Sequence, residues 1–528
     1  MRSYGSGTIS RPPGLDSIEE FHGEVNASSA KFSRPTRVIL VTKSGSNAIH
    51  GSLFETNRDN AYGVARAGDN FTNTAAKLIR NEFGGTAGGP VYIPKLYNGK
   101  NRSFWFFSYE GYKQRTGSFG NYRVPTDAMK NGDFSNLVSS AGTLQTIYDP
   151  LTTQSAANNY ARTPFMYNGK INNIDPARIS PLMKYLYSLL PEPNIPGVNP
   201  VLGNNDSAPN PNIQNQYTYC MRFDQRISQK DLVYGRITKA NGSTYRPNAG
   251  GVPFAGGFGN SRTDTLPNES LSLDWNRTIS PSFFNEFLFS GSRSVSTSFS
   301  GDPSVNYAAQ LGLPNPNGQP GFPVINNIGV GTGSSNYIQP VNWNLRYFNY
   351  FILEDNATKV KGKHEIQFGI HLRADRNNWM PQQQRTAGAE TFQANTTQLY
   401  DPAHSTATNR VALGNTGNVA AAAYLGYATY DVRVAKGMYY IRQNEDTAYI
   451  QDNYRVTSRL KVNLGLRWQF TPYPSDKYNI MSSFDVKNMA IVLGQDLPTL
   501  YRVGATTAPL IAAMTAAGAK FETPQQSR

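Results

Sequence analysis

The sequence predicts an all-β fold in which one wide antiparallel sheet crosses a membrane. Three observations lead to this prediction: polar and apolar residues alternate, the links between alternating segments are by turns short and long, and low hydropathy is combined with many aromatic residues. The 528 residues have a mean hydropathy of −0.49 and 38% hydrophobic side chains, yet 12% are aromatic. A wall one residue thick, apolar outside and wet inside, has this composition.

Alternation with a period of two is the first observation. In the clearest segment, Leu464, Leu466 and Trp468 share one face while Lys461 and Arg467 lie on the other. Successive side chains of a strand point to opposite faces, so such a segment has one apolar and one polar face. A half-buried sheet of a soluble protein also alternates, so alternation alone does not place the sheet in a membrane. The clearest segments are Leu460–Phe470, Glu365–Arg373, Tyr217–Asp224 and Leu271–Asn276.

The lengths of the links distinguish the two possibilities. We expect strands near residues 50–57, 80–90, 103–115, 215–228, 231–241, 268–279, 283–295, 345–360, 364–376, 440–456 and 459–471. Short links between them alternate with long polar ones near 58–79, 116–214, 242–267, 296–344 and 377–439. Tight turns at one rim and long loops at the other are typical of outer-membrane barrels. The long links are rich in Gly, Pro, Asn and Ser and need not be compact, although Asp175–Leu190 has the apolar spacing of a short helix.

Composition excludes further classes of protein and of site. No apolar run is long enough for a transmembrane helix, and the first residues have no apolar core of the kind a signal peptide needs. The single cysteine, Cys220, excludes an intrachain disulfide. The net charge is +14, but the basic residues are scattered without a run of like charges. We therefore expect them to face lipopolysaccharide phosphates of an outer membrane, and we expect no nucleic-acid partner.

Several motifs occur in the order in which one protein family has them. They are Asp16–Phe21, Val38–Asn47 with His50–Glu55, Arg80–Gly85 with Gly88–Pro90, Phe106–Gly111, Val124–Thr126 with Gly132–Ser135, and Tyr449–Asp452 with Leu464–Trp468. In these residues the chain resembles TonB-dependent outer-membrane receptors and is most similar to their Oar-like branch. Each motif is weak alone, and the shared order is what makes the resemblance specific.

The resemblance implies a plug domain inside a 22-stranded barrel, with transport energised by the TonB system. It implies that residues 1–47 are the C-terminal end of the plug and that residues 48–528 are the N-terminal part of the transmembrane barrel. With about eleven strands expected, the chain would be roughly half of such a barrel. We expect the intact protein to import a scarce bulky solute (a siderophore, cobalamin, oligosaccharide or peptide). The alternative is a surface adhesin or scaffold that binds polysaccharide and transports nothing.

Four basic residues are candidate contacts inside the barrel. If the apolar faces meet lipid, then Arg222, Arg373, Lys461 and Arg467 point toward the lumen. They could touch an anionic substrate or the plug, or they could simply belong to the wet lining that such barrels have.

No pattern indicates catalysis, a metal or a cofactor. The five histidines lack paired spacing for zinc and are expected to be isolated and solvated. Neighbouring carboxylates such as Glu354 and Asp355 point to opposite faces of a strand and cannot cooperate as acid and base. We therefore expect no enzyme activity. Trp105, Phe106, Phe107, Tyr439 and Tyr440 are expected in aromatic girdles at the membrane interfaces, and the alternative is that they stack against sugars in a binding loop.

Overall fold

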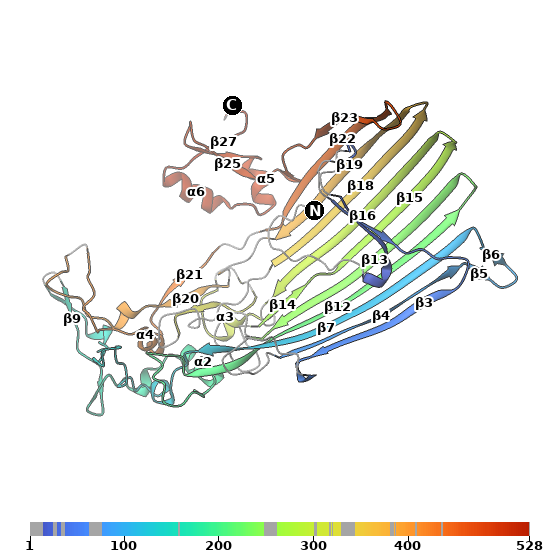
Figure 1. Cartoon of the computed structure of the whole chain (residues 1–528). Helices are drawn as coiled ribbons and strands as arrows, with labels where there is room; N and C mark the ends of the chain where they lie inside the picture. The colour runs from blue at the N-terminus through green and yellow to red at the C-terminus, as the bar shows by residue number, and fades with distance from the viewer. Residues whose placement is uncertain are drawn as a thin grey trace.

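A single wide sheet dominates the structure, which is a computed structural model (Figure 1). The model describes residues 14–24, 29–32, 37–62, 77–156, 159–247, 261–299, 304–315, 318, 320–328, 344–380, 385, 387–406, 409–433 and 437–526. The sheet has thirteen strands, its paired neighbours are antiparallel, and β3 and β23 are its edges. The strands are β3 (His50–Asp59), β4 (Leu78–Pro90), β7 (Ser103–Tyr122), β12 (Asp206–Arg226), β13 (Asp231–Arg246), β14 (Arg262–Thr265), β15 (Asn268–Ser280), β16 (Phe283–Phe299), β18 (Asn344–Lys361), β19 (His364–Met380), β22 (Tyr439–Arg455), β23 (Lys461–Phe470) and β24 (Ser475–Asp476).

The strands expected from alternation are confirmed, because each expected range overlaps a strand of this sheet. The short links all lie at one end of the sheet, on the right in Figure 1. One of them carries a small hairpin of β5 (Tyr92–Ile93) and β6 (Tyr97–Asn98). In another, Gly362 adopts a φ of 62°, which glycine tolerates without a steric penalty. The sheet is therefore a meander of neighbouring strands with tight turns at one rim.

Several strands are longer than expected at the end opposite the tight turns. β7 has 20 residues and β12 has 21, whereas about 9–11 residues suffice to cross a membrane. The added part of β12 includes Pro209, Asn210 and Asn212, and it pairs with Thr116 to Phe119 of β7. Beyond the lipid both faces of the sheet meet water, so the strand continues although the apolar alternation stops. Alternation therefore predicted the membrane-spanning part of these strands but not their extension beyond the lipid.

Apolar side chains cover the outer face of the sheet, as the sequence predicted. Leu464, Leu466 and Trp468 are 66%, 72% and 58% exposed, and no helix or second sheet encloses them in the described part of the chain. Phe223 and Leu273 of interior strands are also largely exposed on this face. Exposed rows of large apolar side chains across a sheet are costly in water and favourable in lipid.

The long links form a compact body that the sequence did not predict. The described residues within 123–205, 304–328 and 387–433, here called the loop domain, share one hydrophobic core. The members of this core that are almost fully buried include Val124, Phe134, Leu137, Ile147, Ile174, Met183, Leu186, Ile325, Ile328, Phe392 and Tyr424. Backbone hydrogen bonds join its parts, for example from Ser180 N–H to Tyr424 O at 2.9 Å. Nothing in the sequence predicted that the links are compact. They are compact because apolar residues from three separate links pack together in one core.

Short helices and strands frame this core. The expected helix between Asp175 and Leu190 is confirmed as η4 (Pro176–Arg178) followed by α2 (Pro181–Leu189), whose N-terminal N–H groups are capped by Ser180. An alanine-rich helix, α4 (Val419–Leu425), is capped by Asn418 and ends at Gly426. The other elements are α1 (Asp127–Lys130), η3 (Pro150–Thr152), β8 (Gln154–Ala156), β9 (Asn159–Ala161), β10 (Met166–Tyr167), β11 (Lys170–Ile171), α3 (Tyr307–Gln310), β17 (Val324–Asn326), β20 (Ala389–Phe392), η6 (Ala394–Thr397) and β21 (Ala428–Asp431).

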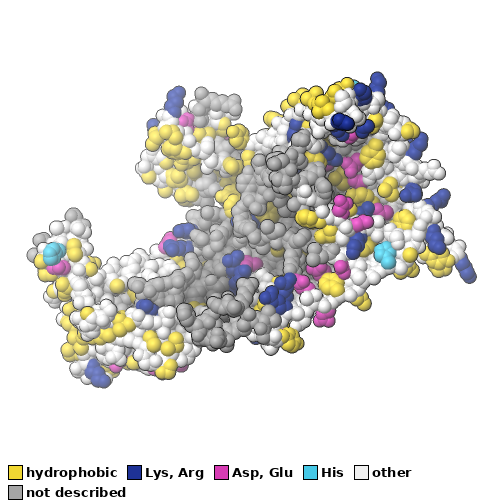
Figure 2. Space-filling view, in the orientation of Figure 1, with side chains coloured by type: hydrophobic (Ala, Val, Ile, Leu, Met, Phe, Trp, Pro, Cys, Tyr) yellow, Lys and Arg dark blue, Asp and Glu magenta, His cyan; other side chains and the backbone are white. Residues whose placement is uncertain are grey.

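Two smaller units complete the chain. At the N-terminal side, η1 (Leu15–Ser17), β1 (Ile18–Glu24) and β2 (Arg37–Thr42) form a hairpin that does not pair with the large sheet. At the C-terminal side, β25 (Ser482–Asp485), β26 (Ala490–Leu493), α5 (Leu497–Arg502), α6 (Ala508–Ala516) and β27 (Lys520–Glu522) form a separate unit with a hydrophobic surface (Figure 2). The predicted domain boundary after residue 47 lies in the link between β2 and β3, and η2 (Asn60–Tyr62) follows β3. No described helix is long and apolar enough to span a membrane.

The expected aromatic girdle is wrong at Phe106. Trp105 and Phe107 lie opposite Phe223 and Met221 on the outer face, whereas Phe106 is 2% exposed on the other face. Three consecutive residues of a strand cannot share one face. Tyr439 and Tyr440 also separate, since the ring of Tyr439 lies by Trp379 while that of Tyr440 packs on Tyr478.

Candidate functional site

The N-terminal hairpin lies across the polar face of the sheet, which we call the inner wall (Figure 1). Figure 2 shows acidic and basic side chains interspersed on the visible part of this region. Residues 29–32, here called the docking segment, reach strands β16, β22 and β23 through polar contacts. The end of β2 reaches β12. The inner wall therefore binds a segment that is distant in the sequence.

Arg467 of β23 holds the backbone of the docking segment. Its Nη1 donates to the carbonyl oxygens of Ala30 and Lys31 at 3.2 and 2.8 Å, and its Nη2 donates to Thr447 Oγ1 at 3.2 Å. On the neighbouring strand, Gln451 Oε1 accepts the Ala30 N–H at 2.7 Å. Donor and acceptor side chains thus satisfy both backbone groups of Ala30.

A glycine lets the segment come so close. A Cβ placed on Gly465, which pairs with Gln451, would lie 2.8 Å from the Cβ of Ala30. Real Cβ atoms do not approach to this distance, so a side chain at position 465 would push the segment away. Gly465 is therefore required by the close approach of another backbone rather than by a turn.

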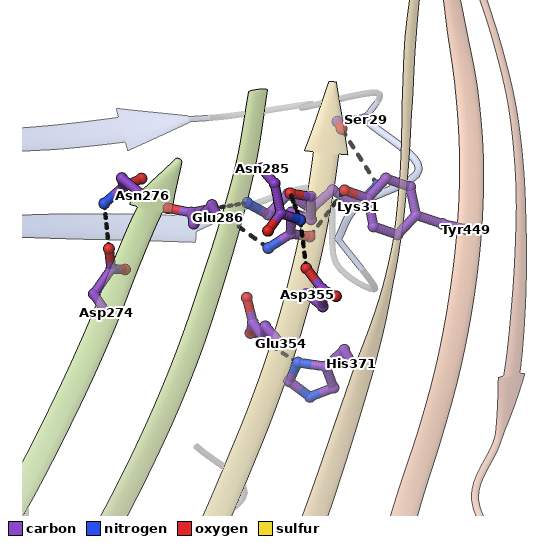
Figure 3. Close-up of polar contacts among 11 residues, drawn as sticks. Ser29, Lys31, Asp274, Asn276, Asn285, Glu286, Glu354, Asp355, His371 and Tyr449 are labelled. Carbon is purple, nitrogen blue, oxygen red and sulfur yellow. Dashed lines mark hydrogen bonds and ion pairs between the residues drawn. The ribbon is translucent and has the colours of Figure 1, made fainter. Parts of the chain in front are cut away.

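Lys31 is the only charged side chain of the docking segment, and it forms an ion pair with Glu286 of β16 (Figure 3). The Nζ–Oε2 distance is 3.1 Å. Asn356 Nδ2 donates to the same Oε2 at 3.3 Å, and Asn356 Oδ1 accepts the Tyr449 hydroxyl at 2.9 Å. Residues of β16, β18 and β22 therefore share one polar network below Lys31, as the sticks of Figure 3 show.

Arg222 of β12 holds the end of β2. Its Nη1 donates to Thr42 O at 2.8 Å, its Nε and Nη2 bind the Asp224 carboxylate, and its guanidinium lies 4.3 Å from the Tyr234 ring centre. Carboxylate and ring fix the orientation of the guanidinium toward the Thr42 carbonyl. Arg222 is the second basic residue of the wall that binds the N-terminal part.

The other two basic candidates have partners within the sheet. Arg373 Nε donates to Asp375 Oδ1 at 2.8 Å, and Lys461 forms an ion pair with Glu365 at 3.4 Å. The structure therefore brings Arg222 and Arg467 to the N-terminal part of the chain, whereas among the described residues Arg373 and Lys461 make no such contact.

The carboxylates and histidines show no catalytic arrangement among the described residues. Glu354 and Asp355 point to opposite faces as expected: Glu354 accepts from His371 at 2.8 Å on the inner wall, and Asp355 accepts from Asn285 at 2.6 Å. His364, His371 and His404 are not isolated, because each contacts a carboxylate, while His364 and His404 are solvent-exposed as expected. No group of three potential metal ligands occurs in the described part of the chain.

Sequence reasoning missed the partners of the two arginines. Gln451 and Tyr449 lie within a motif that carried the family resemblance, whereas alternation does not single out Glu286, because Phe284 and Leu288 share its face of β16. Nothing in Ser29-Ala30-Lys31 marks these residues as a segment that the wall binds. The polar inner wall could therefore be predicted from the sequence, but the segment that it binds could not.

Comparisons with known proteins give one family and several similar structures. The sequence profile of the family described as "Outer membrane beta barrel domain" matches residues 41–521. The siderophore receptor PirA from Acinetobacter baumannii has 12% identity and a TM-score of 0.39 over 87% of this chain and 45% of that chain. The outer membrane transporter YddB from Escherichia coli has 8% identity and a TM-score of 0.40, with coverage of 87% and 45%. A ferric enterobactin receptor, PfeA from Pseudomonas aeruginosa, has 9% identity and a TM-score of 0.40, with coverage of 87% and 47%.

The chain thus spans about half the length of these solved structures. No curated protein matches its sequence.

Proposed function

The chain belongs to the outer membrane beta barrel domain family and is a protein of the outer membrane, and from this premise we propose that it is part of a TonB-dependent receptor of the Oar-like branch. In this proposal the protein imports a scarce bulky solute, the N-terminal hairpin and docking segment belong to the plug, and the protein has no enzyme activity. The solute is a siderophore, cobalamin, an oligosaccharide or a peptide.

The observation that carries this proposal is the way the inner wall holds the docking segment. The contacts are hydrogen bonds from Arg467, Gln451 and Arg222 to backbone groups, together with the ion pair of Lys31. Such bonds contribute about 0.5–1.5 kcal/mol each, and about 1.5–3 kcal/mol when one partner is charged. A segment held by a few polar contacts, rather than by a shared apolar core, is suited to reversible displacement from the wall.

The loop domain supports the same proposal at the other end of the sheet. It stands beyond the extended strands, opposite the tight turns, where long loops of such barrels face the outside. A rigid body in this place can capture a solute before it passes the wall. Its surface is the part of the protein in which we expect solute specificity to lie.

A reversible cross-link tests the proposal directly. Cysteines replace Ala30 and Gly465, where the Cβ atoms would be 2.8 Å apart and need to move only slightly to reach the usual disulfide spacing of about 3.8 Å. Cys220, the single native cysteine, is replaced by alanine to avoid a wrong disulfide. Cells that produce this variant are screened for uptake of candidate solutes under oxidising and reducing conditions, with and without functional TonB.

We expect uptake only in the reduced form and only with TonB. The matched control is the single variant Ala30→Cys in the same Cys220→Ala background, whose uptake should not respond to oxidation. Equal uptake by the oxidised and reduced double variants would show that displacement of the segment is not part of transport.

The compactness of the loop domain favours one second candidate, a surface adhesin or scaffold. A loop domain with its own core can bind a polymer without any passage through the wall. In that case cells that produce the protein would bind polysaccharide equally well with and without TonB, and no solute would be taken up.

A further inference from the structure

The positive charge of the chain is concentrated at the tight-turn rim. We define this rim as the five short links and the strand ends that flank them, residues 91–102, 226–231, 277–283, 359–365 and 455–461. These 39 residues contain twelve Lys or Arg and two carboxylates, a net charge of +10, whereas the net charge of the whole chain is +14. Figure 2 shows Lys and Arg side chains along this end of the molecule, on the right of the view. Basic residues that are scattered in the sequence are therefore brought to one edge by strand pairing.

Most cations of the tight-turn rim are accessible and are not neutralised by the chain itself. All twelve are exposed except Lys359, which is half-buried. The two carboxylates of the rim, Asp231 and Glu365, form ion pairs with Arg277 and Lys461 at 3.8 and 3.4 Å. The other ten cations form no ion pair with any described residue. The rim therefore offers its positive charge to an anionic partner.

The cations lie on both faces of the sheet and in the turns themselves. Arg277 lies on the outer face, Arg455 and Lys461 pair with each other on the inner wall, and Lys230 and Lys363 stand in turns. Side chains that served only to bind lipid headgroups would lie on the outer face, where the sheet meets the membrane. This distribution favours a partner that approaches from the aqueous side, which is the periplasm at the tight turns of such barrels.

The charge extends along the whole rim. Each of the five links has a net positive charge. From β4 to β23 the links span nine strand spacings, which is roughly 40 Å along the sheet. At one end, the hairpin of β5 and β6 projects beyond the sheet in Figure 1, and Lys95 and Lys100 lie in its turn and directly after it. A line of this length, positive throughout, fits an extended polyanion that touches several links at once.

We propose that the tight-turn rim binds peptidoglycan, the carboxylate-bearing polymer of the periplasm. The stem peptides of this polymer present carboxylates at each repeat. Seven of the twelve rim cations are lysines, whose ammonium groups bind carboxylates as point charges without a fixed geometry. One exposed ion pair contributes little, so the affinity comes from many weak pairs along one polymer. This contact attaches the sheet to the cell wall at its periplasmic edge, and it is independent of which solute the protein imports.

Cosedimentation with purified peptidoglycan sacculi tests this proposal. The chain, folded in neutral detergent micelles, is mixed with increasing amounts of sacculi or of sacculi whose carboxyl groups have been amidated, and the protein in the pellet is measured. We expect an affinity for the untreated sacculi that is at least about tenfold higher and that falls as salt is added, because exposed charges are screened. Equal affinity for both kinds of sacculi would overturn the proposal, and this comparison needs no variant.

A variant with four substitutions locates the site. It removes exposed lysines in or next to the turns: Lys95→Gln, Lys100→Gln, Lys230→Gln and Lys361→Gln. We expect it to lose about tenfold in affinity for the untreated sacculi, because four of the charge pairs along the polymer are lost.

The matched control removes the same charge from exposed lysines outside the rim: Lys170→Gln, Lys184→Gln, Lys487→Gln and Lys520→Gln. An equal loss in the control would show that net charge alone attracts the polymer and would overturn the site. Both variants are also titrated with phosphatidylglycerol, and bound lipid is counted by native mass spectrometry. A rim variant that lost affinity for this anionic lipid but not for the sacculi would show that the rim serves the inner leaflet, and the proposal would be wrong.

Discussion

Arg467 is a single side chain that fixes the position of the docking segment. Its alternation with Leu466 and Trp468 places it on the inner wall, and the neighbouring Gly465 leaves room for a second backbone. The guanidinium then binds two consecutive carbonyl groups, which a lysine could not do with the same fixed geometry. The position of the docking segment therefore depends on this residue more than on any apolar contact.

Substitution Arg467→Gln should release the docking segment. The loss of two charge-assisted hydrogen bonds should speed hydrogen exchange of the amides of residues 30–32 by about tenfold or more. Hydrogen exchange followed by mass spectrometry of this peptide gives the rate. Arg373→Gln is the control, since Arg373 pairs with Asp375 on the same wall. The same increase in both variants would contradict the assignment.

The Asp149–Arg178 pair gives the loop domain a dependence on pH. Burial alone would raise the pKa of Asp149, but hydrogen bonds from Arg178 and from the Leu151 N–H outweigh it, so the pKa lies below its usual value. A carboxylate with a lowered pKa stabilises the folded state above its unfolded pKa, and this contribution is lost as the pH falls through the folded value. Arg178 also stacks on Phe165 at 4.9 Å, so the pair is tied to the core.

The loop domain should therefore begin to loosen below about pH 4, the ordinary pKa of an aspartate, and the contribution of the pair should be lost as the pH falls through the lowered pKa of Asp149. Limited proteolysis between residues 123 and 205 at decreasing pH measures this loosening. In Asp149→Asn we expect faster cleavage already at neutral pH and a weaker response to acid. A parent and a variant with identical pH profiles would show that the pair does not control the domain.

At the scale of the element, each strand of the sheet is specified by what its two faces meet. On β15, Leu271, Leu273 and Trp275 face outward while Ser272 and Asp274 are buried on the inner wall. A shift of pairing by one residue would exchange the two sets, so lipid on one side and water on the other fix the register.

Substitution Leu273→Lys should destabilise the sheet by about 2–4 kcal/mol if the residue lies near the middle of the membrane. The reason is the transfer of a charge to the lipid face. Urea unfolding in lipid vesicles, followed by tryptophan fluorescence, measures the free energy of unfolding. Leu273→Met keeps the face apolar and should cost little. Equal stability of both variants would show that this face does not meet lipid.

The whole molecule combines two kinds of stabilisation. The sheet rests on strand pairing and on its apolar outer face, whereas the loop domain has a core like that of a soluble protein. Phe134 is fully buried in that core and meets Tyr424 edge to face, with ring centres 5.8 Å apart. The two parts should therefore respond separately to mutation.

Substitution Phe134→Ala should unfold or loosen the loop domain and leave the sheet intact. Loss of a buried phenylalanine costs about 3–5 kcal/mol. Limited proteolysis should cut residues 123–205 and 387–433 faster, while the circular dichroism of the strands and the urea midpoint of the sheet stay unchanged. A parallel loss of both signals would show that the sheet and the loop domain unfold together.

The sequence by itself determined the strands, their order, the tight-turn rim and, in the four most clearly alternating segments, the face that the strand turns to lipid. These features follow from a period of two within each strand, which is a local property. The sequence did not predict where β7 and β12 end beyond the lipid, because both faces of these strands are polar in that part. It indicated Arg222 and Arg467 as inner-wall residues but did not identify what they bind.

Only the tertiary structure decided which distant segments meet. Arg467 and Lys31 are 436 residues apart, and the core of the loop domain joins three separate links. The few apolar or polar residues of a link follow no regular spacing, so their spacing does not predict which distant residues they contact. Their contacts depend on the sheet, which brings the ends of the links together and holds the docking segment against its inner wall.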